Sequence, residues 1–265
     1  MNAERRFETI VMDPLLDPIE EMTRTVDASV RRSAVVRVRW TAKTDDPLER
    51  WERVIRNLGA IASEGEDPAG HRVTSGGIWT DVRFDPQHRE SFRFDNGAQP
   101  LHTDGAYCAN GFPETAFFYC ERQARAGGHS LFADVEVVAD VLQSIDPELY
   151  RALRSTPVQF SKYDEPGRFE PILTRDERGA RIHWNYYRIA PGQSAETVAM
   201  CERFRAFVER DVARAGAAIR FRLEPGDAVF FQDDRVLHGR EAFEAGAAGD
   251  RLIWKCYVTL SSGSI

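Results

Sequence analysis

Residues 226–243 read GDAVFFQDDRVLHGREAF, and this stretch indicates the fold class more clearly than any other part of the chain. Its apolar run AVFFQ, at 228–232, lies between a Pro-Gly-Asp turn and a second turn at Asp233 and Asp234. A short apolar run bounded by turn residues is typical of a buried β-strand. We therefore predict one strand at 228–232 and a returning strand that carries His238.

Segments of the same kind follow one another from about residue 75 onward. Each is short, and glycine or proline residues separate it from the next, as in turns between strands. Besides 228–232, we predict strands at 115–120, 129–132, 181–189, 219–223 and 252–260. Helical patterns interrupt them at 134–144, with an extension over 147–154 left open, and at 194–215. The last helix is expected to bury one apolar stripe, made of Val198, Cys201, Phe204, Phe207, Val208 and Val212.

The chain before residue 75 is mainly helical in character. Apolar residues at helical spacing predict an amphipathic helix over 47–62, and a second helix is expected over 17–33. The alternating segment VVRVRW, at 35–40, predicts a strand between them. Many short strands, with helices gathered mostly near the N-terminus, favour a mainly-β fold with flanking helices, a sandwich or barrel, over an alternating βαβ sheet.

Length and composition are those of an ordinary globular protein, with 265 residues, 42% hydrophobic and 29% charged. One core can serve a chain of this length, so we expect a single domain over 1–265. Residues 1–74 would be its helical elaboration, and 75–265 its β core with helical insertions. The formal net charge is −7 and no basic run is present, so a nucleic-acid partner is not expected.

The N-terminal residues lack the apolar core of a signal peptide, and no apolar stretch reaches the roughly 20 residues that span a bilayer. We therefore expect a cytoplasmic protein without a membrane partner, and homo-oligomer formation stays open. Four cysteines are scattered without a CxxC pair, so neither a disulfide framework nor a thiolate zinc site is expected.

A candidate metal site begins with the sequence LHTDG, which contains His102 and Asp104. On an extended chain, residues two apart point to the same side, so these two side chains can hold one ion together. His238, on the returning strand, is the best candidate for a third ligand. Two histidines and one carboxylate leave three adjacent positions open on non-haem Fe(II). The HxD pair alone is weak evidence, because two such residues often stand two apart by chance.

Four features occur together in a fixed order: HTDGAY at 102–107, AGGHSLFAD at 126–134, the stretch 226–243, and GDR at 249–251. With these features the chain resembles the Fe(II)/2-oxoglutarate-dependent oxygenases, in the taurine dioxygenase-like and clavaminate synthase-like branch. Its C-terminal part is similar to the γ-butyrobetaine and trimethyllysine hydroxylases. The resemblance covers about residues 75–260, and the features are specific only as a set.

The resemblance implies a double-stranded β-helix, or jelly-roll, with iron held by His102, Asp104 and His238. It implies 2-oxoglutarate as cosubstrate alongside O2, with Arg251 paired to the distal carboxylate. A planar guanidinium can bind a carboxylate through two parallel hydrogen bonds, and Arg240 is the rival for this role. Ser130 stands where this family often has a threonine that faces a cosubstrate carboxylate. A local bond of the Ser130 hydroxyl within its strand is an equal alternative.

The segment HWNYYR, at 183–188, is polar and aromatic in a way unlike a core strand. Strand alternation would turn one set of its side chains toward a pocket and the other set away. The alternative is that its aromatic residues belong to the core and its polar residues to the outer face. With two residues that follow the HxD motif, the candidate substrate-binding residues are Tyr107, Asn110, His183, Trp184, Asn185 and Arg188.

These expectations define an enzyme that hydroxylates an unactivated C–H bond of a small molecule, a free amino acid or a similar zwitterion. The carboxylate of Asp104 argues against halogenation, in which a small residue makes room for a halide on the metal. Desaturation or cyclisation would need the same residues and stays open. Two alternatives belong to other functional classes: a noncatalytic β-helix protein that binds a small ligand, and a zinc hydrolase. Neither explains the presence of Arg251 together with the His-Asp-His set.

Overall fold

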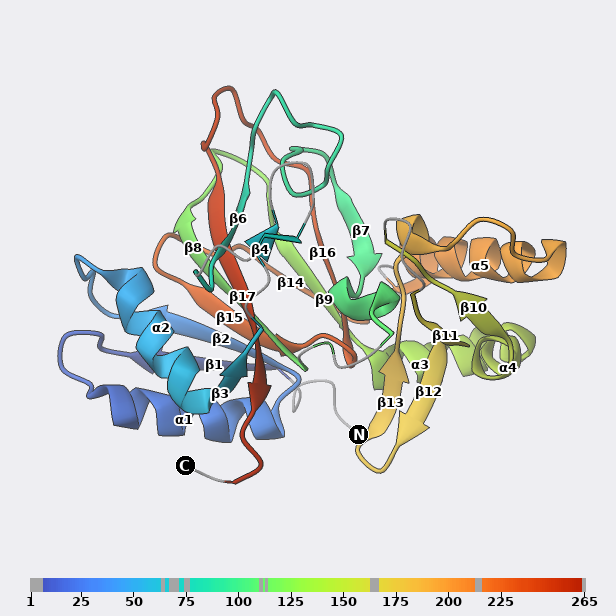
Figure 1. Ribbon diagram of the computed structural model, residues 1–265, viewed down its shortest axis with the longest axis horizontal. Helices are drawn as coiled ribbons and strands as arrows, with labels where there is room; N and C mark the ends of the chain where they lie inside the picture. Colours follow the sequence, from blue (N-terminus) through green and yellow to red (C-terminus); the bar gives the residue numbers. More distant parts are fainter. Residues whose placement is uncertain are drawn as a thin grey trace.

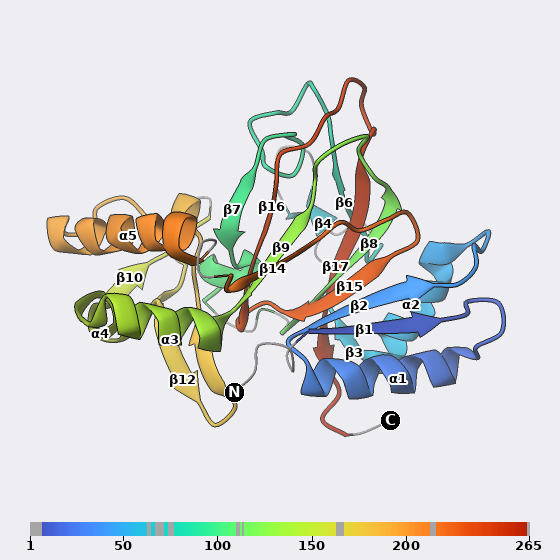
Figure 2. The same ribbon diagram turned by 180° about the vertical axis from the view of Figure 1, so that it is seen from behind.

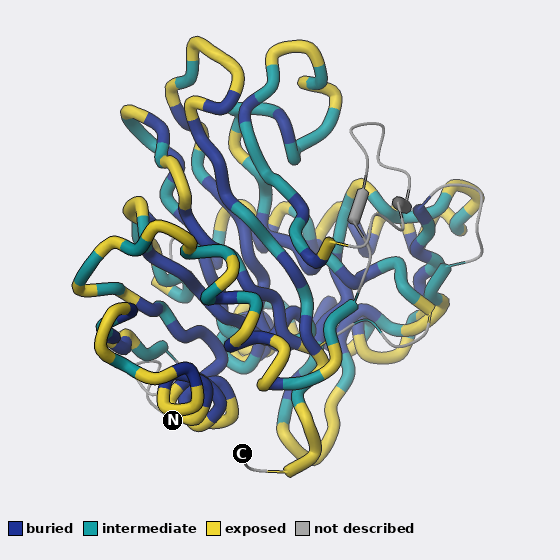
Figure 3. Tube along the Cα trace, turned by 60° about the vertical axis from the view of Figure 1, so that its left-hand side comes forward, coloured by how far each residue is buried: buried dark blue, intermediate teal, exposed yellow. Residues whose placement is uncertain are grey.

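The computed structural model describes residues 7–62, 65–66, 72–73, 77–109, 112, 114–162, 167–212 and 216–263. This part of the chain is mainly β, as the sequence predicts, with helical layers on both sides of the strands (Figure 1). Figure 3 shows that the buried residues follow the strands, whereas the exposed residues follow the loops and the outer faces of the helices. Within the described residues, no helix is both long and apolar enough to span a membrane.

The larger sheet has seven strands in the order β1, β2, β15, β8, β17 and β3, with β6 beside β17. β1 and β2 run parallel, and the other neighbours are antiparallel. Their bounds are β1 Phe7–Met12, β2 Val35–Trp40, β3 Gly59–Ile61, β6 Thr80–Arg83, β8 Thr115–Arg122, β15 Ala228–Gln232 and β17 Leu252–Leu260. The predicted strands at 35–40, 228–232 and 252–260 have the predicted bounds.

The smaller sheet is antiparallel, with the order β14, β9, β16 and β7. Its strands are β7 Gln99–His102, β9 Ser130–Asp134, β14 Ala218–Phe221 and β16 Val236–Arg240. The inner faces of the two sheets share one apolar cluster, to which Phe231 contributes from the larger sheet and Phe132 and Val236 from the smaller. The sheets therefore pack face to face, and side chains on these faces are shielded from water.

Two helices cover the outer face of the larger sheet, α1 at Ile19–Arg32 and α2 at Pro47–Leu58 (Figure 2). Their apolar stripes pack on the sheet around Trp51, which is fully buried. The Trp51 ring stacks on Trp40, with centroids 5.0 Å apart, and lies 5.0 Å from the ring of Phe117. The predicted helix over 47–62 ends four residues early because the chain enters β3 at Gly59.

The second helical layer covers the outer face of the smaller sheet, and it corrects the expectation that the helices gather near the N-terminus. It contains α3 Val135–Ile145, α4 Pro147–Ser155 and α5 Ala195–Phe207, followed by a π-helical turn, Val208–Val212. Beside them lie two hairpins, β10 Pro157–Gln159 with β11 Phe169–Pro171 and β12 Leu173–Asp176 with β13 Gly179–Ile182. A small pair, β4 Gly65–Glu66 and β5 Arg72–Val73, completes the strands.

Local side-chain bonds explain where the expected bounds are wrong. The helix does not run on from 134–144 into 147–154, because Asp146 accepts the N–H of Leu149 and starts α4 anew ahead of Pro147. The predicted strand 181–189 ends at Ile182, because the Asn185 side chain accepts the N–H of Tyr187 and begins a 3₁₀ turn. The expected stripe of α5 is buried except for Val198, which is 45% exposed.

Trp51→Ala should lower the free energy of unfolding by about 3–5 kcal/mol, because it leaves a ring-sized cavity between α2 and the larger sheet. Urea denaturation measures this change. Leu16→Ala is the matched control, since Leu16 is 80% exposed in the same layer, and it should change the free energy by less than about 0.5 kcal/mol. Equal effects of the two substitutions would contradict this account of the core.

Candidate active site

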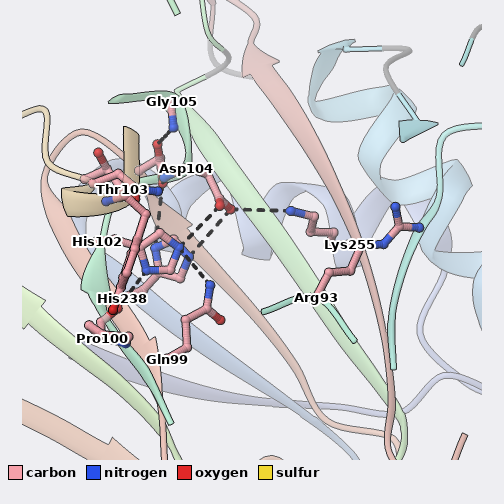
Figure 4. Close-up of polar contacts among 12 residues, drawn as sticks. Arg93, Gln99, Pro100, His102, Thr103, Asp104, Gly105, His238 and Lys255 are labelled. Carbon is pink, nitrogen blue, oxygen red and sulfur yellow. Dashed lines mark hydrogen bonds and ion pairs between the residues drawn. The ribbon is translucent and has the colours of Figure 1, made fainter. Parts of the chain in front are cut away.

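His102 and His238 are cross-strand neighbours on the inner face of the smaller sheet. They are Cα partners in the pairing of β7 with β16, and their ring centroids lie 4.3 Å apart. Asp104 begins a 3₁₀ helix, Asp104–Tyr107, directly after β7. Its carboxylate oxygens lie 3.5 Å from Nε2 of each histidine (Figure 4). Among the described residues, these three form the one group whose ligand atoms converge, all within 4.8 Å of one another.

Both imidazoles are held in a state that suits metal binding. Nδ1 of His102 lies 2.9 Å from the carbonyl of Pro100, so it donates its proton there and leaves the lone pair on Nε2. Nε2 of His102 lies 3.1 Å from the amide nitrogen of Gln99. Burial and the neighbouring His102 lower the pKa of His238 to about 4. His238 is therefore a neutral imidazole at pH 7, the form that binds metal ions.

Asp104 is kept ionised by neighbouring groups from both sheets. Burial alone would raise its pKa, but Lys255 and His238 hold the pKa well below its ordinary value. Nζ of Lys255 lies 3.6 Å from Oδ2 of Asp104, and the Tyr257 hydroxyl donates to the same oxygen at 2.5 Å. Lys255 also donates to the Tyr257 hydroxyl, at 2.9 Å. Neither side chain is identified as part of the site by the sequence motifs alone.

Asp233 supports the loop that carries Asp104 from behind, and no sequence motif marks this role. It is buried, and its two carboxylate oxygens accept the backbone N–H groups of Asp104, at 2.9 Å, and Gly105, at 2.8 Å. Its Oδ1 lies 3.7 Å from Nδ1 of His238. The only sequence signal is a doubled aspartate after an apolar strand, which is also what an ordinary turn looks like.

Thr103, which lies between His102 and Asp104 in the HTD motif, is also held in place by hydrogen bonds. The N–H of Thr103 donates to the carbonyl of Trp184 at 2.6 Å, and the N–H of Trp184 donates to the Thr103 hydroxyl at 3.1 Å. Trp184 therefore joins the loop between His102 and Asp104 to the segment that follows β13.

Arg251 lies just before β17 on the strand face that also carries Lys255 and Tyr257. It is 5% exposed, and its Nε and Nη1 have no hydrogen-bond partner among the described residues. Burial, with a smaller effect of Arg240, lowers its pKa to about 9. A buried guanidinium with two unpaired donors is costly, and an anion with two oxygens is the partner that matches it.

Arg240, the alternative to Arg251 as the carboxylate-binding residue, already has hydrogen-bond partners within the fold. Its Nη2 donates to the carbonyls of Asp95, at 2.8 Å, and Gly97, at 2.7 Å.

Ser130 lies opposite Arg240 in the β9–β16 pairing and is buried. Gly127 and Gly128 form a tight turn ahead of Ser130, with positive φ, and a Cβ at Gly128 would lie 3.6 Å from Nε of Arg251. The turn is therefore next to the unpaired guanidinium.

The candidate substrate residues do not form one face, so the predicted alternation over 183–188 is wrong. His183 is buried, and its Nε2 lies 3.1 Å from Nη1 of Arg168. Both residues line a cavity that Asp233 also lines. The backbone carbonyl of Tyr107 accepts the N–H of Arg168 at 3.2 Å, and the Tyr107 ring lies 5.8 Å from the guanidinium of Arg188. Trp184 and Asn185 line a different pocket, together with His102. Asn110 lies outside the described residues.

A protein-family comparison matches residues 8–257 to the family described as taurine catabolism dioxygenase TauD, TfdA family. The chain belongs to this family. The resemblance inferred from the motifs is thereby confirmed, and it extends into the N-terminal layer that those motifs left unmatched.

The relatives in this family differ in the names they carry. γ-Butyrobetaine dioxygenase from Pseudomonas sp. (strain AK-1) is 29% identical over 235 residues, which are 81% of this chain and 60% of that protein. Uridine-5'-phosphate dioxygenase from Amycolatopsis sp. is 25% identical over 179 residues, 63% of this chain and 62% of that protein. The chain thus spans about 60% of the length of these relatives.

Solved structures agree in fold. An asparagine oxygenase, solved with Fe(II), a hydroxyasparagine and succinate, superposes with a TM-score of 0.70 at 15% identity, covering 90% of this chain and 79% of that one. The PvcB protein from Pseudomonas aeruginosa superposes with a TM-score of 0.65 at 19% identity, covering 96% and 86%. At such identities the likeness establishes the fold and nothing further.

Asp233→Asn should weaken binding of Co(II), used as a spectroscopic metal probe, by about 10- to 100-fold. The amide can accept only one of the two N–H groups, and its own NH2 would face the other. Absorbance titration measures the affinity. Asp234→Asn is the control, because Asp234 bonds Arg181 outside the site, at 2.7 Å. Wild-type affinity in the Asp233 variant would show that the carboxylate does not support the loop.

Proposed function

We propose that the protein is an Fe(II)- and 2-oxoglutarate-dependent dioxygenase that hydroxylates an unactivated C–H bond of a small molecule, a free amino acid or a similar zwitterion. The observation that carries this proposal is the convergence of His102, Asp104 and His238 on the same inner faces as the buried, unpaired Arg251. We further propose that the sheets form a double-stranded β-helix within a single domain. In this proposal the protein is cytoplasmic and binds neither nucleic acid nor membrane, and formation of a homo-oligomer stays open.

The donor set fits Fe(II). Two imidazoles and one ionised carboxylate form the ligand class that leaves adjacent positions open on non-haem iron. His102 offers Nε2 because its Nδ1 is bonded to Pro100, and His238 offers the nitrogen that faces Asp104. Lys255 and Tyr257 hold the Asp104 carboxylate in its anionic form. We assign these three residues as the iron ligands.

Arg251 fits the distal carboxylate of 2-oxoglutarate, with the Ser130 hydroxyl as a second donor from β9. When bound, iron and 2-oxoglutarate together supply the activation of O2 that oxidises a C–H bond. The protein supplies position and a dry wall: the rings of Phe118 and Phe231 pack on His238, with centroids 5.8 Å and 4.7 Å away. Such a wall limits access of water to the reacting centre.

Lys255 is the second cation on this face of β17, and we assign it to an anionic group of the substrate. Its ammonium lies beside Asp104, so a carboxylate bound there would be next to the metal ligands. Of the residues that the sequence suggests for substrate binding, Trp184 and Asn185 stay assigned to the substrate because they share a pocket with His102. Tyr107, His183, Arg188 and Asn110 stay as weaker proposals.

Other outcomes of the same chemistry would use the same residues. Desaturation or cyclisation differs only in the fate of the oxidised carbon. Halogenation is disfavoured because the Asp104 carboxylate lies where a halide would have to bind. A noncatalytic ligand-binding protein is the alternative of another class, and it would release no succinate from 2-oxoglutarate.

Replacing His102, Asp104 or His238 with alanine should abolish succinate release from 2-oxoglutarate in the presence of Fe(II), because each change removes one proposed ligand. Circular dichroism should show that the variants remain folded. Near wild-type turnover in any one of them would remove that residue from the ligand set. Failure of the wild-type protein to form succinate with any candidate substrate would count against the proposed function itself.

Arg251→Lys should raise the KM for 2-oxoglutarate by about 10- to 150-fold, because an ammonium cannot make the two parallel hydrogen bonds of a guanidinium. Steady-state kinetics with varied 2-oxoglutarate measures this effect. Arg240→Lys is the matched control and should change the KM far less, since Arg240 bonds backbone carbonyls. The opposite ranking would transfer the role to Arg240.

A further inference from the structure

Phe243 is a buried aromatic residue next to Arg251, the arginine proposed to bind the cosubstrate. It belongs to a small apolar cluster with Phe84 and Ala124, and the Phe84 ring meets its ring edge-on, with centroids 6.4 Å apart. The N–H of Phe243 donates to the carbonyl of Asn96 at 3.0 Å, and the Asn96 side-chain amide donates to the carbonyl of Phe243 at 3.2 Å. The backbone of Phe243 is therefore fixed by bonds that do not involve its ring.

Two guanidinium groups lie over the Phe243 ring. The central carbon of the Arg251 guanidinium is 5.3 Å from the ring centroid, and that of Arg240 is 4.8 Å from it. Both distances are typical of cation–π attraction, which is stronger where water is excluded. Both arginines are 5% exposed, so the ring attracts two buried cations that repel each other.

The two arginines are held in different ways. Arg240 donates hydrogen bonds to the carbonyls of Asp95 and Gly97. In Arg251, Nε and Nη1 have no hydrogen-bond partner among the described residues, and its guanidinium is attracted by the Phe243 ring instead. A long side chain that is free to rotate loses conformational entropy when a ligand fixes it. A ring that already holds Arg251 removes part of this cost.

The glycine turn ahead of Ser130 meets the ring and the arginine together. Gly127 forms an isolated β-bridge with Phe243, and the N–H of Gly128 donates to the carbonyl of Ala242 at 3.0 Å. A Cβ on Gly128 would lie 3.3 Å from Cβ of Phe243 and 3.6 Å from Nε of Arg251. Any side chain at this position would therefore crowd both groups.

We propose that Phe243 is a positioning residue for 2-oxoglutarate, whose ring orients the Arg251 guanidinium before the cosubstrate arrives. The inference rests on the proposed function, because it takes Arg251 as the partner of the distal carboxylate. The contact between ring and guanidinium exists without the cosubstrate, so its loss acts through the order of Arg251 and removes no bond to the ligand. The expected effect on binding is therefore moderate, about 3- to 10-fold.

The test replaces the ring and compares two 2-oxo acids. Phe243→Leu removes the ring and keeps an apolar side chain. Titration calorimetry on the Zn(II)-loaded protein compares 2-oxoglutarate with 2-oxobutyrate, which has the same 2-oxo acid group and lacks the distal carboxylate. The variant should bind 2-oxoglutarate about 3- to 10-fold more weakly and 2-oxobutyrate as the wild type does. An equal loss for both ligands, or a loss for neither, would overturn the proposal.

Phe84→Leu is the matched control, because Phe84 belongs to the same buried cluster, whereas the ring over the two guanidinium groups is that of Phe243. This control should leave the ratio of the two affinities unchanged, and a selective loss like that of Phe243→Leu would overturn the assignment. Phe243→Met is a second variant without the ring, and it carries the test if the leucine variant does not fold. Circular dichroism measures folding.

Kinetics separates this inference from the proposed function. With Fe(II) and a substrate, Phe243→Leu should raise the KM for 2-oxoglutarate by the same factor and leave kcat unchanged, because the ring acts on the distal end of the cosubstrate. A wild-type protein that neither binds 2-oxoglutarate nor releases succinate would count against the proposed function itself. Wild-type turnover without a selective loss in Phe243→Leu would overturn only the role of Phe243.

Discussion

The antiparallel pairing of β7 with β16 is the constraint on which the site depends. It makes His102 and His238 direct neighbours, and a slip of one residue would turn one of the two imidazoles to the opposite face. The close approach of the strands needs Gly239, since a Cβ there would lie 2.7 Å from the carbonyl oxygen of Gln99. The pairing shifts register between His238 and Arg240, so the regular register that joins the two histidines does not continue beyond them.

Charge is arranged around this pair so that two neighbouring carboxylates, one half-buried and one buried, behave differently. Asp104 faces Lys255 and the Tyr257 hydroxyl, and its pKa lies well below the ordinary value although burial opposes ionisation. Asp233 receives only backbone N–H groups, and burial together with Asp104 raises its pKa to about 7. The larger sheet thus contributes the cation that keeps the ligand ionised, while the turn before β16 contributes the carboxylate that supports its backbone.

The sequence predicts best what is local. The strands at 228–232 and 252–260 follow from apolar runs between turn residues, whereas the HTD motif predicts a metal site only together with His238 and the other motifs. The preference for Arg251 over Arg240 agrees with their different partners in the structure. Sequence reasoning missed the support from Asp233, Lys255 and Tyr257, because their contacts join segments more than 100 residues apart. It failed over 183–188 because one Asn185 side-chain bond turns an expected strand into a 3₁₀ helix.

Two layers of the molecule meet at the candidate site. The proposed ligands and Arg251 lie on or beside the inner faces of the sheets, whereas the segment after β13 and the helix α5 form an aromatic pocket outside β7. The two layers are joined where Thr103 and Trp184 exchange hydrogen bonds. Because Thr103 lies between two proposed ligands, a change in the segment that carries Trp184 must also move the backbone that positions the metal. Phe92 and Tyr187 line the pocket without holding that backbone, so substitutions there should leave the positions of the proposed ligands unchanged.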